Sequence, residues 1–204
     1  MIKRILFDLD GVLFDTQVFH SQVEAALMAE FGVSVDPKEI SLTYAGRPTE
    51  SIFQEILGCD EKTAKDLAKR KWENLLPRAT EARQLCNLTN LFFKIREKDV
   101  AMSIGTSSPS QWAHDLLRLH GLEHFFESRE IVCGDMISRG KPDPEIWLKA
   151  ALDTPAEHCL VVEDGIAGAM GARAAGMRCA LILPNVFPGA IQITTAEDVI
   201  ALLN

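Results

Sequence analysis

The sequence predicts an α/β protein with a Rossmann-like, doubly wound parallel sheet as its core and a small all-helical cap domain inserted after the first strand. Two observations support this prediction. One strand-like apolar run opens the chain, and further apolar runs alternate with amphipathic helices after residue 80. Between them, residues 16–79 show only helical spacing. We therefore expect a core domain at 1–15 and 80–204 and a cap domain at 16–79.

The first strand, Ile5-Leu6-Phe7, ends at two carboxylates, Asp8 and Asp10. Side chains of an extended chain alternate between faces, so both carboxylates leave the strand on the same side. Gly11 permits a sharp turn directly afterwards. Two like charges held so close repel each other unless a cation or a proton joins them. This strand end is therefore the first candidate for a ligand site.

Helix starts and stops divide the cap. Asp36 and Asp60 each precede a helical pattern and are expected to cap it, and Tyr44 begins a loop that runs to Pro48. The first cap helix follows Thr16, and its inward face is expected to consist of Val23, Ala26, Leu27 and Phe31.

Strands and helices alternate after the cap, as in a parallel sheet covered on both faces. Strands are expected at 100–104, 131–133, 159–162 and 178–183, with an edge strand at 191–194. Helices are expected at 90–98, 108–121, 143–151 and 165–175, and a last helix is expected at 197–203.

Composition excludes several classes of function. The 204 residues carry a net charge of −8 without a basic cluster, so we expect no nucleic-acid partner. No apolar run approaches the roughly 20 residues of a membrane span, so we expect no membrane partner. The five scattered cysteines and the absence of a secretory apolar region favour a cytoplasmic protein. We expect a monomer or a weak dimer.

Three further groups lie at or after predicted strand ends: Thr106, Lys141 and the pair Glu163-Asp164. Because the carboxyl ends of parallel strands meet at one edge of a sheet, these groups converge on the first motif. Thr106 stands between a strand and a helix start, where a hydroxyl and backbone N–H groups can hold phosphate; a simple turn residue is the competing interpretation. Several carboxylates with one lysine indicate a hard divalent cation with oxygen ligands, for which Mg²⁺ is the first choice.

With these four motifs in order, the chain resembles the haloacid dehalogenase (HAD) superfamily. More narrowly, it resembles the branch whose small helical cap follows the first motif, which contains phosphatases and β-phosphoglucomutase. The resemblance implies that Asp8 is the nucleophile and Asp10 the general acid and base, with Lys141 neutralising charge in the transition state.

The resemblance also implies two binding sets. Phosphate is expected to be held by Asp8, Leu9, Asp10, Thr106, Ser107 and Lys141. Mg²⁺ is expected to be bound by the carboxylates of Asp8 and Asp164 and the backbone carbonyl of Asp10, with Glu163 acting through water.

In the cap, Gly46-Arg47 resembles the substrate-specificity loop of this branch, and an arginine suits an anionic or polyhydroxylated substrate. His20 lies early in the first cap helix, where some sugar-phosphate mutases carry a functional histidine. A partly exposed helix histidine is the competing interpretation for His20.

The expected function is a Mg²⁺-dependent phosphomonoester hydrolase that acts on a small phosphorylated metabolite, a sugar phosphate or a molecule like phosphoglycolate, through an aspartyl-phosphate. A β-phosphoglucomutase-like phosphosugar mutase is the alternative, because Val12 stands where many phosphatases of the branch have Thr and the mutase has Val. A phospho-accepting signalling module is a third reading, and Asp10 and the inserted cap argue against it.

Overall fold

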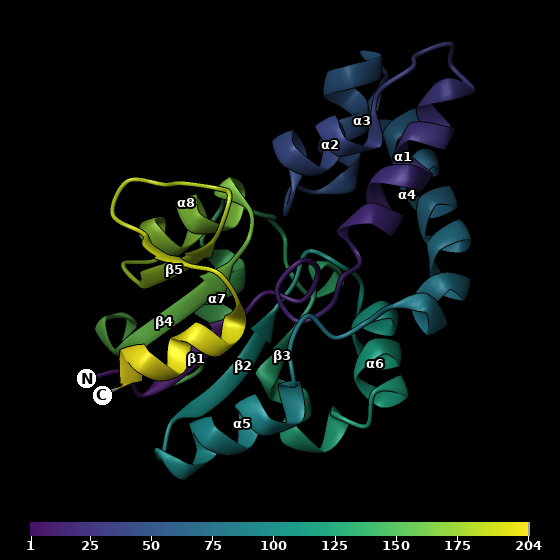
Figure 1. Cartoon of the computed structure of the whole chain (residues 1–204). Helices are drawn as coiled ribbons and strands as arrows, with labels where there is room; N and C mark the ends of the chain where they lie inside the picture. The colour runs from purple at the N-terminus through teal and green to yellow at the C-terminus, as the bar shows by residue number, and fades with distance from the viewer. Residues whose placement is uncertain (204) are drawn as a thin grey trace.

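The computed structural model of the chain describes residues 1–203 (Figure 1). Its core is a six-stranded, fully parallel sheet with the strand order β3-β2-β1-β4-β5-β6. The strands are β1 (Arg4–Phe7), β2 (Ala101–Gly105), β3 (Ile131–Val132), β4 (Cys159–Glu163), β5 (Arg178–Ile182) and β6 (Ile191–Ile193). The strand order reverses between β1 and β4, so the crevice beyond their carboxyl ends is the place where such sheets bind ligands.

Helices cover both faces of the sheet, which confirms the doubly wound core. Along β1, Ile5 and Phe7 point into the larger hydrophobic cluster, whereas Leu6 points into a second cluster on the opposite face. The larger cluster is completed by α5 (Leu88–Glu97), α6 (Ser110–Leu119) and the 3₁₀ helix η6 (Ala196–Leu203). The opposite cluster is completed by α7 (Glu145–Ala150) and α8 (Ile166–Ala174). Short 3₁₀ turns lie at Glu123–Phe125, Ser128–Glu130, Gly134–Met136 and Ala156–His158.

Four helices stand apart from the sheet (upper right in Figure 1): α1 (Gln17–Ala29), α2 (Pro37–Tyr44), α3 (Thr49–Leu57) and α4 (Glu61–Leu75). They share a core of their own, formed by Leu27, Met28, Ile40, Ile52, Phe53, Ala64 and Leu67. The side chains of Asp36 and Asp60 accept backbone N–H groups at the starts of α2 and α4, as expected of caps.

We propose 16–79 as the bounds of this cap. At its end the chain returns to the core, because Leu75 and Ala79, the latter in the 3₁₀ helix η1 (Leu76–Glu81), already pack into the larger cluster. The longest helix of the described chain, α4, has 15 residues. No helix within residues 1–203 is long and apolar enough to cross a membrane.

The last expected helix is present as the 3₁₀ helix η6, whose turns are tighter than those of an α-helix. The expected inward face of α1 was wrong in part: Val23 and Leu27 pack into the cap core as predicted, but the other two residues do not. In α1, Ala26 is exposed, and Phe31 lies beyond the helix with 51% of its surface exposed. The inward face instead includes Glu24, which is only 3% exposed because Lys71 of α4 neutralises it inside the cap.

Candidate active site

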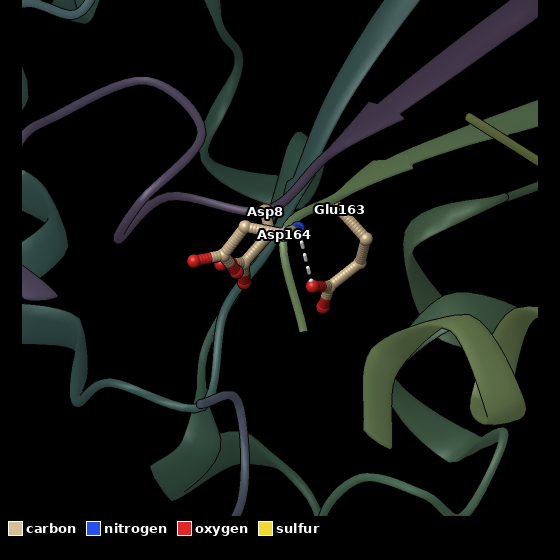
Figure 2. A group of neighbouring side chains, drawn as sticks. All are labelled: Asp8, Glu163 and Asp164. Carbon is tan, nitrogen blue, oxygen red and sulfur yellow. Dashed lines mark hydrogen bonds between the residues drawn. The ribbon is translucent and has the colours of Figure 1, made fainter. Parts of the chain in front are cut away.

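The four sequence motifs meet beyond the carboxyl ends of β1 and β4, at the point where the strand order reverses. Asp8 directly follows β1, Glu163 ends β4, and Lys141 comes from the loop before α7. Figure 2 shows the carboxyl groups of Asp8 and Asp164 turned the same way, while the Glu163 carboxylate turns back to the backbone N–H of Asp164. The geometry thus brings together groups that are up to 156 positions apart in the sequence.

Lys141 is the electrostatic centre of the site. Its Nζ donates to Asp8 Oδ1 and to Glu163 Oε1 at 2.6 Å each, and it is 1% exposed. The same ammonium lies 4.5 Å from the centre of the Trp147 ring. Burial alone would lower the pKa of Lys141, but the charges of Asp8 and Glu163 raise it above its ordinary value. Lys141 is therefore a fixed positive charge beside Asp8.

One lysine does not balance the carboxylates around it. Ligand atoms of Asp8, Glu163 and Asp164 lie within 4.8 Å of one another. Burial, followed by the charges of Glu163 and Asp10, raises the pKa of Asp8 to about 8 although Lys141 opposes the shift. Burial and the charges of Glu163 and Asp8 also raise the pKa of Asp164 well above its ordinary value. This electrostatic crowding calls for a further cation.

The donor set fits a divalent cation. Glu163 already uses both oxygens, because Oε1 accepts from Lys141 and Oε2 accepts the backbone N–H groups of Asp164 and Gly165 at 2.9 and 2.8 Å. By contrast, Asp164 Oδ1 is, within residues 1–203, the buried side-chain polar atom that lacks a hydrogen-bond partner. Buried polar atoms are normally paired, so the unpaired Asp164 oxygen indicates that a cation binds at this position.

Gln17, the first residue of α1, is a member of the site that the sequence motifs do not reveal. Its Nε2 donates to the backbone carbonyl of Asp10 at 3.1 Å and to Asp164 Oδ2 at 3.2 Å. Those two oxygens belong to the set expected to bind the metal. The positive end of an amide therefore bridges oxygens where a cation is expected.

Asp10 is held by four side-chain contacts. Its Oδ1 accepts from the Thr16 hydroxyl at 2.5 Å and the Trp112 indole at 2.9 Å, and it lies 3.2 Å from His20 Nε2. Its Oδ2 accepts from the Ser108 hydroxyl at 2.6 Å. Burial alone would raise the pKa of Asp10, but the charge and hydrogen bond of His20 and the hydroxyl donors lower it below its usual range. Asp10 is thus ionised in this arrangement, and His20 is its direct partner.

The loop after β2 lies opposite Asp8. Thr106 is 1% exposed, its hydroxyl oxygen accepts the Ser108 backbone N–H at 3.0 Å, and residues 106–108 line a cavity that also contains Asp8 and Asp10. The Leu9 side chain is fully buried in the hydrophobic core. If Leu9 binds phosphate, it therefore does so through its backbone and not through its side chain.

The cap loop between α2 and α3 lies directly on the core. Ser107 Oγ donates to the carbonyl of Gly46 at 2.9 Å. A Cβ atom on Gly165 would lie 2.6 Å from the carbonyl oxygen of Ala45, and one on Gly140 would lie 2.5 Å from Cγ of Pro48. The loop therefore closes over the third and fourth motifs.

The cavity enclosed between this loop and the core measures about 50 Å³. A groove of about 310 Å³ lies beside it and shares Thr49, Trp72 and Ser107 with its lining. Arg47 also lines the cavity, and its guanidinium pairs with Glu55 at 2.6 Å. The cap further contributes residues that no motif indicated: Ser21, Glu24, Ile40, Ser41, Tyr44, Thr49, Ile52, Lys71 and Trp72.

Known proteins share this sequence pattern. The profile of the haloacid dehalogenase-like hydrolase family matches residues 5–182. The fructose-1-phosphate phosphatase YqaB of Escherichia coli is 29% identical over 180 residues, which cover 85% of this chain and 92% of YqaB. The β-phosphoglucomutase of Bacillus subtilis is 28% identical over 188 residues, which cover 86% of this chain and 81% of the mutase.

A solved structure shares the fold. The crystal structure of β-phosphoglucomutase from Clostridium difficile matches with a TM-score of 0.83 at 20% identity, covering 98% of this chain and 93% of that chain. The family match confirms the resemblance seen in the four motifs and the expectation of an enzyme. The chain belongs to the haloacid dehalogenase-like hydrolase family, in the branch that contains phosphatases and β-phosphoglucomutase.

Proposed function

We propose that this protein is a Mg²⁺-dependent phosphomonoester hydrolase that acts on a small phosphorylated metabolite through an aspartyl-phosphate. One observation carries the proposal: Lys141 holds Asp8 at 2.6 Å, beside an Asp164 oxygen that is buried without a partner, at a cavity that also contains Asp10. Such a site can hold a phosphate group against a carboxylate nucleophile and offer a second carboxylate for proton transfer.

In the proposed mechanism an oxygen of Asp8 attacks phosphorus, and the bond from phosphorus to the leaving oxygen breaks. Asp10 supplies the proton that the leaving oxygen takes up. A water molecule that loses its proton to Asp10 then attacks the phosphoryl group, which releases inorganic phosphate and restores Asp8. Lys141 keeps Asp8 in place and neutralises charge on the phosphoryl oxygens.

Asp8, Asp164 and the backbone carbonyl of Asp10 would hold Mg²⁺, with Glu163 as an outer partner. The bound ion supplies charge neutralisation at the phosphoryl oxygens. Gln17 donates to two of these groups, Asp164 Oδ2 and the Asp10 carbonyl, and so orients the residues that would hold the ion.

Asp10 has the ionisation state of a base in this arrangement, because its four side-chain partners favour the carboxylate. That state suits the step in which water is activated. To donate to the leaving oxygen, Asp10 first has to take up a proton from water and leave these contacts toward the substrate, and the water-activation step of the previous turnover can supply that proton. The role of His20 is accordingly to hold Asp10 between steps.

Two observations favour the mutase alternative: His20, at the helix position where some sugar-phosphate mutases carry a functional histidine, lies 3.2 Å from Asp10, and a β-phosphoglucomutase is 28% identical to this chain. Val12, on which that alternative depended, is fully buried in the hydrophobic core, and the cavity lining does not include it. Membership of the hydrolase family argues against the third reading, a phospho-accepting signalling module.

The test is release of phosphate from p-nitrophenyl phosphate and from a panel of sugar phosphates, with Mg²⁺ and with excess chelator. Activity is expected to disappear with chelator and return with Mg²⁺. Rapid quenching and peptide mapping should locate a covalent phosphate on Asp8. Asp8→Asn should form no adduct, and Asp10→Asn should accumulate it with a good leaving group and lose about 10²–10⁴-fold in turnover.

Asp66→Asn is the matched control, because Asp66 is an exposed carboxylate of α4 outside the cavity lining. It should behave like the wild type. Full activity in excess chelator, or a phosphate adduct mapped to Asp10, would contradict the proposal.

A further inference from the structure

The cap contains a buried charged cluster that the proposed mechanism does not use. Lys71 Nζ of α4 donates to Glu24 Oε1 of α1 at 2.6 Å and to Thr49 Oγ1 of α3 at 2.8 Å. Lys71 and Glu24 are each 3% exposed. Buried ion pairs are costly to desolvate and are weak stabilisers compared with apolar packing. Although the cluster joins α1, α3 and α4, the stability of the cap does not require charged groups here, so a second role in contacting a ligand is worth testing.

The cluster faces the reactive carboxylates. Glu24, Thr49 and Lys71 line the same cavity as Asp8 and Asp10. With the phosphate at Asp8, the remainder of the substrate has to extend toward the cap side of this cavity. The cluster thus lies on the side of the cavity toward which the leaving group of a phosphate ester would extend.

We propose that Glu24 determines specificity: together with Lys71 and Thr49 it binds the hydroxyl groups of an uncharged polyol and excludes leaving groups that carry a second anion. This inference rests on the proposed function. It narrows the substrate class to monophosphates of neutral sugars or sugar alcohols, and it disfavours phosphorylated acids and bisphosphates.

Hydrogen-bonding capacity supports the choice of a hydroxyl ligand. An ammonium carries three protons, and Glu24 and Thr49 occupy two of those of Lys71. The Glu24 carboxylate retains lone pairs, and the Thr49 hydroxyl can donate its own proton. The cluster therefore offers donors and acceptors side by side. A hydroxyl group uses both, whereas a phosphate or carboxylate uses donors only.

Charge supports the exclusion of a second anion. The basic side chains on the lining, as far as the described chain shows, are His20, Arg47 and Lys71. Each already pairs with a carboxylate, at 3.2 Å from Asp10, 2.6 Å from Glu55 and 2.6 Å from Glu24 respectively. A second anion would meet the buried charge of Glu24 in a medium where like charges repel strongly.

The experiment compares kcat/KM for two substrate pairs that differ only in a terminal CH₂OH or carboxylate: sorbitol 6-phosphate with 6-phosphogluconate, and glycerol 3-phosphate with 3-phosphoglycerate. The wild type should favour the neutral member of at least one pair by about ten-fold or more. Glu24→Gln leaves the Lys71 charge unbalanced, so it should shift that ratio toward the acid by about ten-fold or more.

Two further variants complete the design. Glu30→Gln is the matched control, because Glu30 follows α1 and pairs with Arg70 of α4 at 2.7 Å, outside this cavity. It should keep the wild-type ratio. The double variant Glu24→Gln/Lys71→Met removes both charges, so it covers the case in which Glu24→Gln does not fold, and it should also lose the preference.

The outcomes separate the two claims. A wild type that hydrolyses p-nitrophenyl phosphate but does not favour the neutral member of either pair by about ten-fold overturns the inference alone. So does an unchanged ratio in the foldable Glu24 variants. A wild type that releases phosphate from none of these compounds, p-nitrophenyl phosphate included, overturns the proposed function and the inference with it.

Discussion

Replacing Lys141 by Met removes the positive charge at the centre of the site and keeps an unbranched side chain of similar length. The ammonium serves two buried carboxylates at 2.6 Å each, and all three side chains are at most 4% exposed. Removing one partner of a buried ion pair costs about 3–5 kcal/mol, and the upper end applies here because two carboxylates lose their partner. That cost rivals the whole stability of many domains, about 5–15 kcal/mol.

The assay is urea denaturation followed by tryptophan fluorescence, in chelator and in Mg²⁺. Mg²⁺ should restore part of the lost stability, because a cation that binds only the folded state stabilises it. A second variant, Lys141→Met/Glu163→Gln, also removes one of the unbalanced carboxylates. We expect the double variant to be more stable than Lys141→Met, although it has lost more hydrogen bonds.

Lys65→Met is the matched control, because the Lys65 ammonium pairs with Glu61 on the surface and is 66% exposed. Its unfolding curve should superimpose on that of the wild type. If Lys141→Met loses less than about 1 kcal/mol, or if the double variant is less stable than the single one, Lys141 does not act by balancing these carboxylates. Turnover of Lys141→Met should fall by about 10²–10³-fold.

Three other predictions follow from the site. Burial raises the pKa of Asp8 in the folded protein to about 8, from 3.8 in the unfolded chain. In the absence of metal, the protonated carboxyl of Asp8 therefore stabilises the folded state fully below pH 3.8, and this stabilisation is lost as the pH rises toward about 8. Urea denaturation in chelator should therefore show lower stability at pH 8 than at pH 5, and the opposite order would contradict this sign. Trp112→Phe keeps a buried ring but removes a donor to the Asp10 carboxylate, which should cost about 1–3 kcal/mol by the same assay, whereas no change would show that the indole N–H is dispensable. Gly168→Ala would place a Cβ atom directly against the Glu163 carboxylate and should abolish most phosphatase activity. Gly171→Ala, whose Cβ would lie 3.2 Å from the Trp147 ring, should be far milder, and equal activities would refute the clash.

The sequence predicts the core well because its signals are local. The buried run Ile5-Leu6-Phe7 is a strand in the structure, and the four motifs fall at one edge of the sheet because parallel strands all end there. Asp36 and Asp60 begin helices as expected, since a capping carboxylate acts on N–H groups two or three residues away.

The parts of the fold and of the candidate site that the sequence does not predict depend on contacts between distant parts of the chain. Glu24 looks like a surface residue of α1, and only the packing of α1 against α4 brings it to Lys71, 47 positions away. Trp112 reaches Asp10 across 102 positions. The sequence of the first cap helix is compatible with both a functional and a plain helix histidine at position 20, and only the structure places His20 beside Asp10. No periodicity encodes such pairs.

Two glycines of the core have an evolutionary consequence. Neither Gly140 nor Gly165 has a positive φ, so their backbones would accept any side chain. What forbids one is the cap loop, through Pro48 and the carbonyl of Ala45. Selection at these two positions therefore acts on the fit between the cap and the core. Relatives that lost or reshaped this loop are free to place larger residues there, and a change at either glycine should be inherited together with a change in the loop.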